Sequence, residues 1–134
     1  MKRKMILMVD DDKDLLEELE SVFGSCGYEA KGISDVSAVV KTAEELHPDV
    51  ILLDMKMAGK SGFQIADDLR HFPATAEIPI IAMTGHFTEK QHMNFMRSLG
   101  IRECVLKPFD PKSILVVVKQ FMNNPGFALP GETR

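Results

Sequence analysis

What the sequence lacks excludes several classes of protein. No apolar run is long enough to cross a bilayer and no signal peptide is recognisable, so we expect a cytoplasmic protein without a membrane partner. Cysteines are few: Cys26 and Cys104 lie far apart, and we expect two reduced, largely buried thiols rather than a disulfide framework. Lysine and arginine (16) do not outnumber the acids (20), and the net charge is −4. Direct binding of nucleic acid is therefore not expected, because phosphate recognition needs a basic face.

The composition that remains is that of a globular domain, with 134 residues, 45% of them hydrophobic and 27% charged. Short apolar runs of strand length alternate with stretches in which apolar residues follow helical spacing. The predicted strands are Met5–Val9, a short strand that starts with Tyr28–Ala30, and then Asp49–Leu53, Ile78–Met83 and Glu103–Leu106. The predicted helices centre on Leu15–Phe23, Val36–Leu46, Phe63–Leu69, Thr88–Leu99 and the segment that begins at Pro111.

The last predicted helix contains conflicting signals. Its run Ile114–Val118 is β-branched and favours a strand. The preceding Asp110-Pro111 offers an N-cap followed by proline at the first helical position, and we therefore predict a helix. We predict one domain over residues 4–122. Residues 123–134 hold two prolines and two glycines without periodicity, which is typical of a tail or the start of a linker.

Five strands that alternate with five helices predict an α/β fold with a doubly wound parallel sheet. Among the topologies that right-handed crossovers allow, we expect the flavodoxin-like (βα)5 arrangement with strand order 2-1-3-4-5. In this order the first and third strands are neighbours. Asp10 and Asp11 follow the first strand and Asp54 follows the apolar run of the third. Their carboxylates are therefore expected to converge at one edge of the sheet.

The predicted edge carries groups that suit phosphoryl transfer. Adjacent carboxylates repel one another, and a divalent cation is the simplest way to offset that repulsion. A carboxylate such as that of Asp54 can attack phosphorus, while Lys107 and Thr84, at the ends of two further strands, can hold anionic oxygens. We interpret Asp12 as a solvated residue that begins the first helix.

The order and spacing of five strand ends resemble the receiver domains of two-component response regulators. The matching segments are Met5–Asp12, Asp49–Met55, Gly59, Gly62, Pro79–Gly85 and Lys107–Phe109. The resemblance covers roughly residues 4–122. It implies a signalling domain that takes a phosphoryl group from a sensor histidine kinase or histidine phosphotransfer protein and catalyses only its own phosphorylation and dephosphorylation. A downstream protein, a fused output domain or a second copy would then read the change.

The resemblance also implies roles for single residues. Asp54 would be the phosphoacceptor, and Thr84 and Lys107 would hold the phosphoryl group. The Lys107–Pro108 bond would be cis. Asp11 and Asp54 would bind Mg²⁺ directly, and Asp10 would act directly or through water. The backbone carbonyl of Lys56 would be a further ligand.

One departure from the common receiver pattern bears on the conformational switch. Cys104 stands where the family usually has an aromatic residue whose ring turns inward when Thr84 moves, and a thiol cannot make that movement. A phosphate-independent, receiver-like interaction module is therefore the alternative function.

Lys56 and His86 lie two residues after Asp54 and Thr84 respectively, at positions that tune hydrolysis of the acyl phosphate in the family. We hypothesise that both hinder the attacking water.

Two other classes fit the sequence less well. A haloacid dehalogenase-like phosphohydrolase needs a second aspartate two residues after the nucleophile, where this chain has Lys56. A flavin-binding electron carrier of the same fold must cradle a phosphate in its first loop, and Asp10–Asp12 would repel it.

Overall fold

A parallel sheet of five strands forms the centre of the computed structural model, which describes residues 3–85 and 90–123. The strands are β1 (Met5–Val9), β2 (Glu29–Ile33), β3 (Val50–Asp54), β4 (Ile80–Thr84) and β5 (Ile101–Leu106). The helical elements of this part of the chain are α1 (Lys13–Ser25), the short 3-10 helix η1 (Val36–Ala38), α2 (Val39–Leu46), α3 (Gly62–Arg70), α4 (Lys90–Ser98) and α5 (Pro111–Asn123). The strand order β2-β1-β3-β4-β5 confirms the predicted flavodoxin-like topology.

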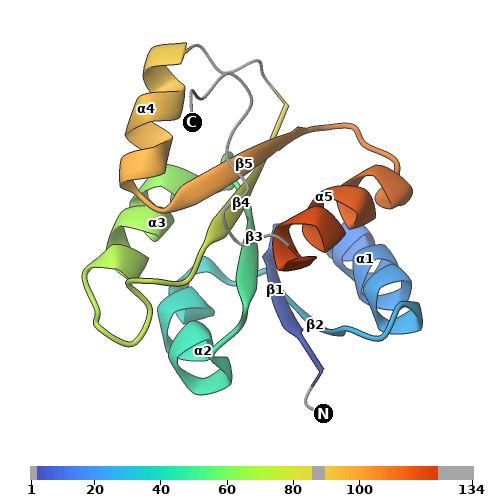
Figure 1. The fold of residues 1–134 in the computed structure, drawn as a ribbon. Coiled ribbons are helices and arrows are strands. Elements are labelled where there is room, and N and C mark those ends of the chain that lie inside the picture. Colours follow the sequence, from blue (N-terminus) through green and yellow to red (C-terminus); the bar gives the residue numbers. More distant parts are fainter. Residues whose placement is uncertain (1–2, 86–89, 124–134) are drawn as a thin grey trace.

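Helices cover both faces of the sheet. Helices α1 and α5 lie on one face, and α2, α3 and α4 lie on the other (Figure 1). Strand β1 shows how the two cores arise: Leu7 and Val9 pack in the cluster on the α2–α4 face, whereas Ile6 and Met8 pack in the cluster on the α1–α5 face. Central strands that are buried on both faces need apolar residues at every position, which explains the continuous apolar runs in the sequence.

The predicted start of the first helix is confirmed. Asp12 is the N-cap of α1, and its carboxylate accepts a hydrogen bond of 3.1 Å from the amide of Leu15. Helix α3 begins with a capping box, in which Ser61 and Gln64 each accept a hydrogen bond from the other's backbone amide. These caps place the first turns of both helices beside the carboxyl ends of β1 and β3.

The conflict in the last helix is resolved in favour of helix, as predicted. Ile114, Val118 and Phe121 are buried at helical spacing against the sheet. The carboxylate of Asp110 accepts a hydrogen bond of 2.9 Å from the amide of Lys112 in the first turn. Burial of one apolar stripe therefore outweighs the strand preference of the β-branched residues.

Several predicted boundaries were wrong. Strand β2 begins at Glu29, one residue after the predicted start at Tyr28, and continues to Ile33; its side chains alternate between exposed and more buried positions and leave no apolar run that would mark its end. Strand β5 begins at Ile101, before a register shift opposite Ile80 and Ile81 that the sequence does not show. The predicted helix near residues 88–99 is described only from Lys90 onward, and the predicted tail lies almost wholly outside the described residues.

The expectation of two largely buried thiols was also wrong for one of them. Cys26 is exposed, since it is the C-cap of α1 and lies in the surface turn before β2. Cys104 is half-buried, and neither cysteine forms a disulfide. Among the described helices, none is both long and apolar enough to cross a membrane.

Candidate functional site

Three carboxylates meet at the carboxyl end of the sheet. Strands β1 and β3 are neighbours, with Val9 opposite Leu53, so the following residues Asp10 and Asp54 lie side by side. Asp10, Asp11 and Asp54 each offer an oxygen that lies within 4.8 Å of the other two. Asp10 and Asp54 are buried and Asp11 is exposed. The cluster thus faces solvent on the side of Asp11.

Backbone amides hold the carboxylates in place. The amide of Asp12 donates to Oδ1 of Asp10 at 2.9 Å, and the amide of Lys56 donates to Oδ1 of Asp54 at 3.1 Å. A longer contact of 3.5 Å joins the amide of Ala58 to Oδ2 of Asp11. Because the loops after β1 and β3 supply these donors, the acids are positioned by the backbone.

Lys107 supplies the positive charge of the site. Its Nζ lies 2.5 Å from Oδ2 of Asp10 and 3.5 Å from Oδ2 of Asp54. Its amide donates to the carbonyl of Thr84 at 2.7 Å, which fixes the residue after β5 to the end of β4. The peptide bond from Lys107 to Pro108 is cis, as the resemblance implied.

Burial and neighbouring groups shift the pKa values of Asp54 and Lys107. Burial raises the pKa of Asp54, and the Asp10 charge adds to the rise, although the Lys56 amide and the Lys107 ammonium oppose it. For Lys107, burial alone would lower the pKa, but the hydrogen bond and charge of Asp10, together with Asp54, outweigh it, so the pKa is raised. Lys107 therefore keeps its proton at neutral pH.

Gly62 allows the loop after Asp54 to fold tightly against the strand. A Cβ at Gly62 would lie 2.6 Å from Cα of Met55 and 2.7 Å from the carbonyl oxygen of Asp54. Both contacts are with backbone, which cannot move aside cheaply. The sequence placed Gly62 at the start of a helix but gave no sign of this close approach, since the contact depends on how α3 packs on β3.

The remaining predicted site residues are Thr84, Cys104, Lys56 and His86. Thr84 ends β4 beside the site, and its carbonyl bonds to Lys107. Cys104 pairs with Ala82 of β4, and its Sγ lies 3.9 Å from Sδ of the buried Met96 in α4. Lys56 is exposed in the loop after β3. The prediction for His86 lies outside the described residues.

A hollow of about 400 Å³ opens beside the ammonium of the site. It lies between the start of α1 and the loop after β5 and is lined by Asp12, Leu15, Lys107, Pro108 and Phe109. Its lining is more apolar than the acid cluster and gives a second molecule a surface next to Lys107.

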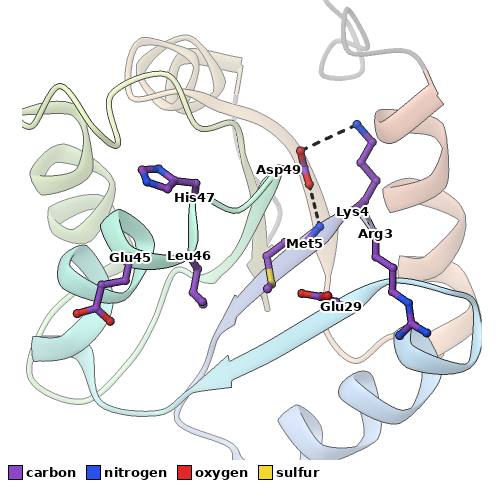
Figure 2. Close-up of a pocket in the computed structure, with 8 residues that line it drawn as sticks. All are labelled: Arg3, Lys4, Met5, Glu29, Glu45, Leu46, His47 and Asp49. Atoms are coloured by element: carbon purple, nitrogen blue, oxygen red, sulfur yellow. Dashed lines mark hydrogen bonds and ion pairs between the residues drawn. The ribbon is translucent and has the colours of Figure 1, made fainter. Parts of the chain in front are cut away.

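A second hollow, of about 370 Å³, lies at the amino ends of the strands, opposite the acid cluster (Figure 2). There Oδ2 of Asp49 accepts a hydrogen bond of 2.8 Å from the amide of Met5, and Lys4 lies 4.0 Å from its other oxygen. Asp49 thus joins the beginnings of β1 and β3.

Comparison with known proteins places this arrangement in context. The family model for the response regulator receiver domain matches residues 6–119. The DNA-binding response regulator MtrA of Mycolicibacterium smegmatis is 33% identical over 117 residues, which cover 87% of this chain and 50% of that protein. The phosphate regulon transcriptional regulatory protein PhoB of Escherichia coli K12 is 29% identical over 119 residues, covering 89% of this chain and 52% of PhoB. The chain therefore spans about half the length of the curated relatives it matches.

Solved structures agree on the fold. The chemotaxis protein CheY4 of Vibrio cholerae superposes with a TM-score of 0.81 at 23% identity, covering 89% of this chain and 98% of CheY4. A CheY-like receiver domain protein of Methanospirillum hungatei gives a TM-score of 0.80 at 21% identity, covering 91% of this chain and 95% of that protein.

Proposed function

The chain belongs to the response regulator receiver domain family, and from this premise we propose that Asp54 accepts a phosphoryl group from a phosphohistidine donor. One observation carries the proposal: the Asp54 carboxylate lies among two further carboxylates within 4.8 Å and has the Lys107 ammonium at 3.5 Å. The product would change how the domain binds other proteins, and the chain would catalyse only its own phosphorylation and dephosphorylation.

In the proposed step, a carboxylate oxygen of Asp54 attacks phosphorus and forms an O–P bond. The P–N bond to the donor imidazole breaks, and its electron pair stays on the departing nitrogen. The Lys107 ammonium, already within 3.5 Å of Asp54, would hold an anionic oxygen of the transferred group. The Thr84 hydroxyl, at the end of the neighbouring strand, would donate to another.

The donor set suits Mg²⁺, because hard divalent cations take oxygen ligands and the acid cluster supplies three of them within 4.8 Å. We assign the ion to the carboxylates of Asp10, Asp11 and Asp54 and to the backbone carbonyl of Lys56. When bound, Mg²⁺ neutralises charge on the phosphoryl group. The exposed Asp11 leaves a solvent-facing side for it to enter.

The phosphodonor would approach over the hollow beside Lys107. The half-buried Leu15 and Phe109 and the exposed Pro108 offer apolar contact there, next to the ammonium that would hold an oxygen of the transferred phosphoryl group. A sensor histidine kinase or a histidine phosphotransfer protein is the donor class that this chemistry requires. The exposed Lys56 would stand over the acyl phosphate, and we keep the hypothesis that it hinders the attacking water together with His86.

The output would come from a separate protein or a fused domain. MtrA is described as DNA-binding and PhoB as a transcriptional regulatory protein, and this chain matches about half of each. Within the chain, residues 4–122 would form the receiver and 123–134 a tail or linker. Cys104 stands at the position of the family's aromatic residue, and its thiol contacts Met96. This contact supports a phosphate-independent interaction module as a second candidate.

The proposal is tested by intact-mass measurement after incubation with acetyl phosphate and Mg²⁺. We expect one phosphoryl adduct on the native chain and none on Asp54→Asn. The control Asp49→Asn removes an aspartate just before the amino end of β3 and should leave the adduct undiminished. Chelation with EDTA should abolish the adduct. An adduct that persists in Asp54→Asn would refute the assigned acceptor. Its absence from the native chain, while another receiver is modified in parallel, would favour the phosphate-independent module.

A further inference from the structure

Each outer strand of the sheet has a backbone amide that donates to a glutamate carboxylate. The sheet ends at β2 on one side and at β5 on the other. Outward N–H groups on such strands are open to pairing with a strand from another molecule, and proteins block this pairing in various ways.

On β5 the blocked amide is that of Cys104. The amide of Lys107 points toward β4, where it donates to the carbonyl of Thr84. Successive amides of a strand point to opposite sides, so the amide of Cys104, three residues earlier, points away from β4. Oε1 of Glu103 accepts a hydrogen bond from this outward amide at 2.9 Å. The carboxylate therefore occupies the place where a further strand would bond.

Glu103 is unusual because it is only 4% exposed. It lies two residues before Val105, on the face of β5 that packs in the cluster with α5. None of the ion pairs in the described part of the chain includes it. Burial raises the pKa of Glu103, and the bond from the Cys104 amide only partly opposes this. Burying a carboxylate without an ion-pair partner costs free energy. The hydrogen bond from the Cys104 amide offsets part of that cost.

On β2 the same arrangement is built from a helix. The amide of Glu29 donates to the carbonyl of Lys4 on the β1 side, so the amide of Gly32 points outward. Oε1 of Glu20, on α1, accepts from it at 2.9 Å. A Cβ at Gly32 would lie 2.9 Å from Cβ of Leu16 and 2.9 Å from that same oxygen. Only glycine lets α1 bring the carboxylate this close.

We propose that Glu103 and Glu20 are carboxylate caps that close the two edges of the sheet against strand addition by a second copy of this chain. An incoming strand would have to displace the carboxylate and accept the amide in its place. Glu103 is the stronger cap because it is buried, whereas Glu20 is exposed and its hydrogen bond competes with water. The proposal concerns the unmodified chain and does not depend on phosphorylation.

Amide hydrogen exchange, followed by NMR on the full chain, tests the capping bond. In the native protein the Cys104 amide should exchange more slowly than that of Leu106, whose N–H also points outward and has no carboxylate acceptor among the described residues. Glu103→Met has a side chain of similar length but no acceptor oxygen, and it should speed exchange of the Cys104 amide by about five- to tenfold. Glu103→Gln keeps an acceptor oxygen and should retain the protection. The inward amide of Val105 should not change in either variant.

Sedimentation velocity over a range of concentrations tests the closure of the edges. The double variant Glu20→Met/Glu103→Met should form dimers at concentrations where the native chain and Glu20→Gln/Glu103→Gln remain monomeric. Equal exchange at Cys104 and Leu106 in the native protein would overturn the proposal without any variant. It would also fall if the double methionine variant, folded by circular dichroism, sedimented as the native chain does.

Discussion

Removal of the Lys107 ammonium should destabilise the protein in a way that Mg²⁺ reverses. The side chain of Lys107 is 25% exposed, but those of its partners Asp10 and Asp54 are only 0% and 7% exposed. Lys107→Met leaves both buried carboxylates, and the nearby Asp11, without a cation. Loss of one partner of a buried ion pair costs about 3–5 kcal/mol, and the partial exposure of Lys107 places this case near the lower end, about 3 kcal/mol.

The assay is urea unfolding of the native chain and Lys107→Met, each in EDTA and in Mg²⁺. In EDTA the variant should lose about 3 kcal/mol of unfolding free energy. In Mg²⁺ the loss should shrink, because a bound cation replaces the missing positive charge. Lys60→Met is the matched control: the Lys60–Asp68 ion pair has side chains that are 40% and 39% exposed, and its loss should cost under about 1 kcal/mol.

Two results would refute this reasoning. If Lys107→Met and Lys60→Met lost the same stability in EDTA, the buried carboxylates would not depend on Lys107 for neutralisation. If Mg²⁺ did not raise the unfolding free energy of Lys107→Met at all, the acid cluster would not bind the ion in the folded state.

Three further predictions concern single groups. Gly62→Ala should lower the unfolding free energy by about 1–3 kcal/mol and slow phosphorylation by acetyl phosphate, because its Cβ would meet the Asp54 carbonyl at 2.7 Å; Gly24→Ala, which meets nothing within 4 Å, should do neither. Asp12→Ala should cost about 1 kcal/mol in urea unfolding through loss of the α1 cap. Glu103→Gln should stabilise the chain at neutral pH, since the raised pKa means that the ionised carboxylate opposes folding; the gain should vanish as the pH falls below the unfolded-state pKa, where Glu103 is protonated in both states. A pH-independent difference in unfolding free energy would contradict this last prediction.

The fold was predictable where burial leaves a local mark. Strands β1 and β3 are covered on both faces, so every position before Asp54 is apolar and each run is visible in the sequence. Their acids follow directly, and parallel pairing brings the carboxyl ends together, which is why the convergence of Asp10 and Asp54 could be expected. Strand β2 left no such mark, since an outer strand exposes every second side chain.

Other features depend on contacts between distant segments and were not predictable. The ion pair of Lys107 with Asp10 joins residues 97 positions apart, so the sequence supplied the charges but not their contact. Gly62 lies against Met55 because α3 packs closely on the end of β3. The exposure of Cys26 follows from its place in a surface turn, where its small apolar side chain gives no indication of its surroundings.

Two buried carboxylates show why one part of the molecule could be found from the sequence and another could not. Asp54 and Glu103 both have a pKa raised by burial. Asp54 ends a continuous apolar run, so its position at the edge where strand ends meet already suggests chemistry. Glu103 lies within an outer strand, in a sequence context that an ordinary solvent-facing glutamate would share. Its burial and its bond to the Cys104 amide emerge only when the direction of each amide in β5 is known. A buried carboxylate without a cationic partner needs a hydrogen-bond donor. For Glu103 on β5 this donor is the outward Cys104 amide, which would otherwise remain open to pairing with a second strand.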